Sequence, residues 1–237
     1  MTQPHRLLSL DIWRGFAVVL MIIYHFFFDL NHFGYVEINF NGEWLWRLFR
    51  YFIISLFLLS VGISLVLSHA KSMAFKQIIK RLLQLTTASL LVSMASYLLF
   101  PATWIYFGIL HFIALASLLG LLFISFPNLS LLTALIIWLT NMIGVLNMHW
   151  LFALLQPYLF LPNKTEDLVP FFPWFAMVLL GIFLAKQSYF SRILVAVFWT
   201  KFAKVGDILG VFGRHSLLIY LIHQPLLFAM FWIKTFV

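Results

Sequence analysis

The sequence predicts an all-α polytopic integral membrane protein, a single bundle of about seven transmembrane helices with its N-terminus in the cytoplasm. Three observations lead to this fold class. Hydrophobic residues make up 64% of the 237 residues and charged residues only 9%, with a mean hydropathy of +1.03. The apolar residues come in runs of roughly 20, the length that crosses a bilayer as a helix. Lysine and arginine are divided unequally between the connecting segments.

The composition excludes a water-soluble domain, in which about a quarter of the residues would be charged. In lipid, each spanning segment must satisfy its own backbone hydrogen bonds, which selects helices. The chain has no cysteine, so disulfides and thiol catalysis are excluded. The net charge of +8 sits in short connections, where it sets orientation, and does not indicate a nucleic-acid partner.

Apolar runs define the expected spans, which lie at 8–30, 45–68, 80–100, 104–126, 129–147, 168–186 and 211–235. Proline marks several of their ends, at Pro101, Pro127, Pro162 and Pro170. No connection is long enough to hold a soluble domain, so residues 1–237 are expected to form one transmembrane domain. The first run is too long and too charged for a cleaved signal peptide, and we expect it to be a retained helix.

The basic residues favour an N-terminus inside and a C-terminus outside. On that orientation the cytoplasmic side receives Arg6, Lys71, Lys76, Lys80, Arg81, Lys186, Arg192, Lys201, Lys204 and Arg214. The opposite side receives Arg47, Arg50, Lys164 and Lys234. Segment 187–205 mixes aromatic and basic residues, and is either an interfacial helix on the cytoplasmic leaflet or a solvated connector.

Four polar side chains in the first span are the most informative ones, because an intramembrane charge costs roughly 2.5–3.5 kcal/mol at the bilayer centre. They are Asp11, Arg14, His25 and Asp29. At 100° per residue all four share one helix face, which must look into the bundle or a wet cavity. Asp29 lies one turn beyond His25, where it can hydrogen-bond the ring. Such a pair suits base catalysis, although a purely structural bridge between helices explains it equally well.

Further polar residues lie in later spans. His111 is either a packing hydrogen bonder or a functional residue. Asp167 is either an exposed loop acid or a group turned toward the cavity of His25 and Asp29. In the last span Ser216, Tyr220 and His223 are spaced four and three apart and share a face. The serines that recur every four residues at Ser60, Ser64, Ser68, Ser89 and Ser93 predict close helix packing.

The opening run SLDIWRGFAVVLMIIYHFFFDL resembles the first helix of the transmembrane acyltransferase superfamily, with Arg14 and His25 at its Arg-x10-His spacing. Three further runs resemble the compact bacterial branch of the heparan-alpha-glucosaminide N-acetyltransferase catalytic family: YFGILHFIALASLL, DLVPFFPWFAMVLLGIF and GRHSLLIYLIHQPLL. The resemblance covers nearly the whole chain, with the four runs in order.

This resemblance implies an acyltransferase in the bacterial inner (plasma) membrane. Cytoplasmic acetyl-CoA, or another acyl-CoA, would donate the acyl group to a sugar amine or hydroxyl on the extracytoplasmic side. Arg14, with Asp11 and Arg214 beside it, would meet the phosphates of the donor, since the arginine fork matches phosphate oxygens.

The resemblance also implies roles at the reacting groups. His25, aided by Asp29, would deprotonate the acceptor, and His111 or His223 would donate to the developing oxyanion. Asp167 and Tyr220 would bind the acceptor. The expected partners are membrane lipids, acyl-CoA and a glycan or other extracytoplasmic acceptor; no metal is expected, and a homo-oligomer is left open.

Two other functions stay open. A small-solute or lipid transporter or flippase could use the same polar cavity, because intramembrane His and Asp also serve as proton relays. Against it, the two halves of the sequence lack matching Gly- or Pro-broken helices. The third hypothesis, besides the acyltransferase and the transporter, is that the protein is a noncatalytic membrane partner.

Overall fold

The computed structural model describes residues 3–70, 75–165, 167–187 and 203–234. Within these ranges the regular structure is helical, as the composition predicts, apart from one isolated bridge between Phe107 and Leu168. The chain divides into two compact units, residues 1–60 with 188–237, and residues 61–187. Each unit is described by itself, and the single domain expected from the sequence stays a prediction. Most of segment 187–205 lies outside the described residues.

Three helices in the described part are long and apolar enough to cross a membrane. They are α1 (Gln3–His32), α2 (Trp44–Ala70) and α3 (Phe75–Leu99). A fourth candidate is the bent pair α10 (Ala203–Arg214) and α11 (Ser216–Lys234). Three of the expected spans are therefore matched by long helices, and the last by a bent pair.

The remaining apolar helices of the described part are shorter. They are α4 (Ile109–Gly120), which continues as a 3₁₀ turn over Leu121–Phe123, α5 (Pro127–Met142) and α7 (Phe171–Lys186). With 15 residues over Ile109–Phe123 (12 in α4 and 3 in the turn) and 16 in each of the others, they reach about 22 and 24 Å at 1.5 Å per residue, short of a hydrocarbon core of about 30 Å.

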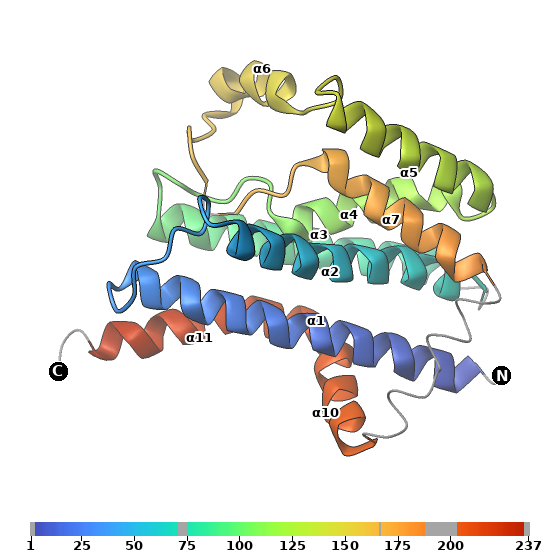
Figure 1. Ribbon diagram of the computed structural model, residues 1–237, viewed down its shortest axis with the longest axis horizontal. Coiled ribbons are helices and arrows are strands. Elements are labelled where there is room, and N and C mark those ends of the chain that lie inside the picture. The colour runs from blue at the N-terminus through green and yellow to red at the C-terminus, as the bar shows by residue number, and fades with distance from the viewer. Residues whose placement is uncertain (1–2, 71–74, 166, 188–202, 235–237) are drawn as a thin grey trace. The chain divides into compact units, whose positions relative to one another are not determined.

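In the first unit α1 packs against both α10 and α11, which Figure 1 draws in orange and red beside the blue α1. The contacts between α1 and α11 advance together along both helices. His25 lies against His223, Asp29 against Gln224, and His32 against Phe228. The two helices are therefore parallel.

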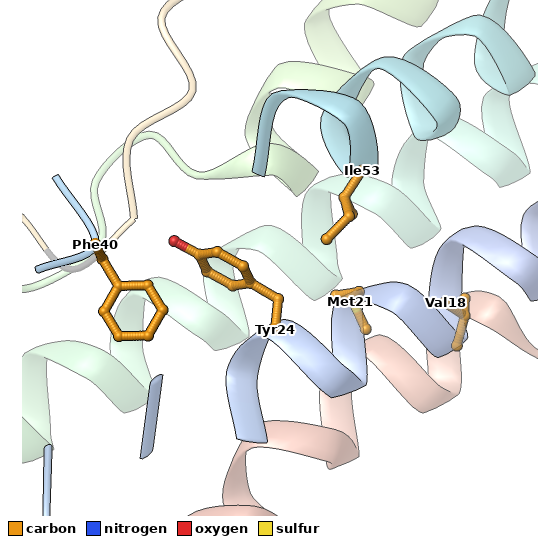
Figure 2. Packing of buried hydrophobic residues seen from close by; sticks show 5 residues of the cluster. All are labelled: Val18, Met21, Tyr24, Phe40 and Ile53. Carbon is orange, nitrogen blue, oxygen red and sulfur yellow. The ribbon is translucent and has the colours of Figure 1, made fainter. Parts of the chain in front are cut away.

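The hydrophobic core of this unit lies on another part of α1 and faces α2 (Figure 2). Val18, Met21 and Tyr24 follow one another along α1, and Phe40 and Ile53 pack against them from the 33–43 connection and from α2. Trp13 of α1 donates its indole N–H to the carbonyl of Leu56 at 2.9 Å. These contacts fix the rotation of α1, so its polar face turns toward α10 and α11.

Two glycines allow α10 to approach the first half of α1 closely. A Cβ placed on Gly213 would lie 1.7 Å from the backbone oxygen of Asp11, and one on Gly15 would lie 1.8 Å from that of Leu209. Only glycine fits at either contact without moving a backbone. The contact holds α10 in place, and the chain bends by 87° at His215 before α11 begins. The expectation of one continuous helix over 211–235 is therefore wrong.

In the second unit α4 packs on α3, and α5 and α4 pack on α7. The helices α4 and α7 begin later than expected, at Ile109 and Phe171 instead of about 104 and 168. The reason is tertiary, because the two segments before them pair with each other through the Phe107–Leu168 bridge.

A short helix, α6 (His149–Leu159), was not expected from the sequence. Its 11 residues are too few to span a bilayer, so it lies between the spans that the apolar runs predict. It ends where Phe160 adopts a left-handed conformation, with φ 50° and ψ 40°.

Candidate active site

His25 of α1 and His223 of α11 form the centre of the candidate site. Their rings meet edge to face, with centroids 4.9 Å apart and an interplanar angle of 65°. Tyr24 and Phe28 pack against the ring of His25 at 5.8 and 6.3 Å. The predicted polar face of α1 thus turns into the bundle of its own unit.

The hydrogen bond of His223 fixes its tautomer. Nδ1 lies 2.6 Å from the backbone oxygen of Tyr220, and a carbonyl can only accept, so Nδ1 carries the proton. In the neutral ring Nε2 then holds a lone pair. This Nε2 is buried and has no hydrogen-bond partner among the described residues. A histidine in this state is equipped to take a proton, not to donate one from Nε2.

Asp29 is fully buried and bound by Gln224, not by His25. The side-chain Nε2 of Gln224 donates to Oδ1 of Asp29 at 2.8 Å. Within the described ranges, Oδ2 of Asp29 and Nδ1 of His25 are buried without a partner. The expected hydrogen bond between His25 and Asp29 is therefore absent, because the carboxylate is turned toward α11.

Unpartnered polar atoms concentrate at this site. In the described part of the chain, five buried side-chain nitrogen or oxygen atoms lack a partner, and four of them belong to His25, Asp29, His223 and Gln224. Each such atom costs about 1–3 kcal/mol unless a ligand or water completes it. Their clustering on two facing helices therefore indicates a place where a polar ligand binds.

Arg14 and Asp11 lie at the other end of the same helix face. Nη1 of Arg14 is 3.6 Å from Oδ1 of Asp11, and Arg214 at the end of α10 lies close enough to act on Asp11 electrostatically. The close contact of Gly213 with Asp11 brings the end of α10 here. Arg14 and His25 are about 16 Å apart along the axis of α1, by helical rise.

Tyr220 connects the candidate site to the core. Its ring lies 5.5 Å from that of His223, and its side chain packs, half-buried, against the cluster around Tyr24. Its backbone oxygen is the group that fixes the His223 tautomer. The structure thus gives Tyr220 a positioning contact, and its predicted role in binding the acceptor stays a prediction.

His111 belongs to the second unit, where both of its ring nitrogens are hydrogen-bonded. The hydroxyl of Ser93 donates to the carbonyl of Ile105 at 2.6 Å, so it accepts from Nε2 of His111 at 3.0 Å. Nδ1 of His111 accepts from the backbone N–H of Gly108 at 3.3 Å. These bonds hold the segment before α4 against α3. The predicted oxyanion role of His111 would require one of them to break.

Asp167 caps the beginning of α4. Its Oδ2 accepts the backbone N–H of Ile109 at 3.3 Å, where a carboxylate is favoured by the helix dipole. Thr165 ties the same segment to the carbonyl of Trp104 at 2.9 Å. Asp167 is thus bound to the backbone at the start of α4 and is not a free loop acid, and its role toward an acceptor stays a prediction.

Ser64 is more than a small packing residue, because it accepts a hydrogen bond from Nη1 of Arg81 at 3.0 Å. Ser60 and Ser89 bond their own helices, to the carbonyls of Phe57 and Thr86. These serines, whose four-residue spacing predicts a packing role, thus also form hydrogen bonds with a charged side chain and with backbone carbonyls.

A comparison with protein families identifies the family of the chain. The family model described as heparan-alpha-glucosaminide N-acetyltransferase, catalytic, matches residues 6–225. The chain belongs to this family. No curated protein and no solved structure gives a significant match.

Membership in the heparan-alpha-glucosaminide N-acetyltransferase catalytic family implies a membrane acyltransferase-like function that uses acetyl-CoA. The matched residues include Arg14, the His25–His223 pair and the Asp29–Gln224 pair. The resemblance noticed from the four sequence runs is thus confirmed at the level of the family.

Gln224 is the residue of the site that the sequence analysis missed. It directly follows His223 in the run YLIHQPLL, and an uncharged amide in an apolar helix draws little attention beside a histidine. One feature of the sequence could have pointed to it. An amide side chain inside a membrane span is costly unless it is hydrogen-bonded, which implies a partner on a facing helix.

Proposed function

We propose that this protein is a membrane-embedded acetyltransferase that moves an acetyl group from cytoplasmic acetyl-CoA to a sugar amine or hydroxyl on the extracytoplasmic side. The observation that carries the proposal is the group of four buried, unpartnered polar atoms on α1 and α11, which includes a histidine nitrogen with a free lone pair. The family supplies the reaction class.

His223 is the general base of this proposal. Its Nε2 takes a proton from the acceptor as the acceptor's nitrogen or oxygen attacks the thioester carbonyl. The carbon–sulfur bond then breaks, and CoA leaves with a proton returned from His223. Tyr220 stabilises the imidazolium through its carbonyl, which keeps the Nδ1–H in place.

His25 stabilises the negative charge on the thioester oxygen, by donating from Nδ1. The roles expected for the two histidines are thus exchanged. The reason is that His223 has the fixed tautomer of a base, whereas His25 lacks the orienting bond to Asp29. A preorganised donor to an oxyanion contributes about 2.7–4 kcal/mol to catalysis.

Arg14 and Arg214 bind the phosphates of the donor at the cytoplasmic end. The support is their convergence around Asp11 at the end of α1 that the basic residues place inside. The separation of about 16 Å from Arg14 to His25 is a distance that an extended pantetheine arm could cover.

Seven membrane crossings suit the parallel packing of α1 and α11. If both helices span, the chain leaves α1 on one side and enters α11 from the other, so the intervening segment crosses an odd number of times. The helices α2 and α3 account for two of those crossings. One or all three of the segments that contain α4, α5 and α7 would then cross as well, each helix being completed by the residues that flank it, and all three give seven.

The test is acetyl transfer by the detergent-purified full chain. Acetyl-CoA is offered with glucosamine, and released CoA and acetylated product are both measured. Thermal unfolding with acetyl-CoA and with free CoA is followed in parallel, since a ligand of the native state stabilises it. We expect a saturable shift that is lost in Arg14→Ala.

A transporter remains the competing function, because a buried Asp beside two histidines also suits a proton relay. It predicts no stabilisation by acetyl-CoA and no product. That result would overturn the acetyltransferase proposal.

A further inference from the structure

Gln224 has one satisfied end and one open end. Its Nε2 donates to Oδ1 of Asp29 at 2.8 Å, and its Oε1 is buried with no hydrogen-bond partner in the described part of the chain. A residue that served only to join α1 and α11 would gain from having both ends paired. The open carbonyl therefore points to a group that is not part of the chain.

The open atoms around Gln224 share one chemical character. Oε1 of Gln224 and Oδ2 of Asp29 are acceptors. Nε2 of His223 is also an acceptor, because its Nδ1 holds the proton. These three atoms can be completed only by N–H or O–H donors. The phosphate and thioester oxygens of an acyl-CoA would leave them unpaired, whereas an amine or hydroxyl of the acceptor would not. The pantetheine arm also carries amide N–H groups, so the KM for acetyl-CoA in a Gln224 variant distinguishes the two sources.

We propose that Gln224 is a binding residue for the acceptor substrate, which is a deeper statement of the proposed function and rests on it. Its Oε1 accepts a hydrogen bond from an N–H or O–H next to the attacking group. Its Nε2 holds the Asp29 carboxylate so that Oδ2 accepts a second one. The ligand class is a molecule with donors on neighbouring carbons, such as an amino sugar or a polyol.

This arrangement selects against simple amines. An amine without a neighbouring hydroxyl satisfies the lone pair of His223 but leaves Gln224 or Asp29 open. A site built from buried polar groups discriminates strongly against a ligand that leaves them unpaired. Glucosamine, which carries hydroxyls beside its amine, and cyclohexylamine, which carries none, are therefore matched probes.

The experiment compares Gln224→Met with the parent protein, using the full chain in detergent. Methionine keeps the length of the side chain but has neither an amide N–H nor a carbonyl. The control is Gln84→Met, the same substitution at an exposed position on α3. For each protein, thermal unfolding is measured with glucosamine, cyclohexylamine and acetyl-CoA separately, and KM is measured for glucosamine and for acetyl-CoA.

We expect Gln224→Met to raise the KM for glucosamine at least tenfold, and to remove its preference over cyclohexylamine. The KM for acetyl-CoA and the shift it produces should stay unchanged, and Gln84→Met should behave as the parent does. A glucosamine KM within twofold of the parent value would overturn the proposal. If Gln224→Met does not fold, Gln224→Asn is used in its place, because it keeps an amide but shortens the side chain by one methylene. The same change in the KM for glucosamine then tests the proposal.

The outcomes separate the two proposals. Transfer that is retained by the parent and unaffected in the Gln224 variants refutes the role of Gln224 and leaves the proposed function standing. A parent that neither binds nor acetylates glucosamine contradicts the acceptor class in the proposed function, and the role of Gln224 falls with it.

Discussion

His223 donates its Nδ1–H to the backbone carbonyl of Tyr220 at 2.6 Å, one turn earlier on the same helix. Serine-type triads use a carboxylate for this purpose. Here the nearby carboxylate, Asp29, is bound to Gln224 instead. A neutral carbonyl fixes the tautomer without adding charge, which suits a site surrounded by apolar helices.

Replacing His223 by asparagine should separate its two nitrogens. The amide of Asn can replace Nδ1–H toward Tyr220, but it offers nothing at the position of Nε2. We therefore expect His223→Asn to fold with near-parent thermal stability and to lose acetyl transfer by about 10²–10⁴-fold, the usual contribution of a general base. The exposed His215 on the same segment provides the control His215→Asn, which should keep full activity. Substantial activity in His223→Asn would assign the base elsewhere.

Asp29→Asn should test whether the charge of this buried carboxylate matters. The amide keeps an oxygen that can accept from Gln224, so the contact between α1 and α11 survives. We expect the KM for glucosamine to rise at least tenfold, because a charge-assisted hydrogen bond to the acceptor becomes a neutral one or is lost. The matched change Glu37→Gln, at an exposed position after α1, should leave KM unaltered. An unchanged KM in Asp29→Asn would remove Asp29 from the acceptor site.

Gly213→Ala should destabilise the first unit. The added Cβ would lie 1.7 Å from the backbone oxygen of Asp11, so α10 must move away from α1. Overpacking of this kind costs about 1–3 kcal/mol, which we expect to see as a lower midpoint of thermal unfolding. Displacement of α10 should also weaken the stabilisation by acetyl-CoA. In Gly210→Ala, on the same helix, the new Cβ meets only the ends of side chains, those of Leu8 at 3.3 Å, Arg214 at 3.6 Å and Ile12 at 3.8 Å, and a smaller effect should result.

The proposed topology places Glu37 and Asp207 on opposite sides of the membrane. Glu37 follows α1, whereas Asp207 lies on α10, before α11 begins. Because the chain has no cysteine, Glu37→Cys and Asp207→Cys each introduce a unique thiol. In intact cells, a membrane-impermeant maleimide should label the first and not the second. Labelling of both from outside would contradict the parallel spanning of α1 and α11.

The sequence was sufficient for the all-α architecture with helices long enough to span a membrane, for the family and for the polar face of α1. Charged residues are so few that lipid is the only solvent compatible with the chain, and helical periodicity alone puts Asp11, Arg14, His25 and Asp29 on one side. It was also sufficient to select His223 as a residue of interest.

Tertiary structure decided which of these groups bond to one another. Periodicity places Asp29 one turn from His25, but it cannot reveal that Gln224, 195 residues away in the chain, competes for the same carboxylate. Likewise, an apolar pattern over 211–235 cannot show that α10 is held against Asp11 through Gly213, so that the helix breaks at His215. Hydrophobic patterning specifies what must be buried, whereas hydrogen-bond pairing depends on which side chains from distant segments arrive at the same place.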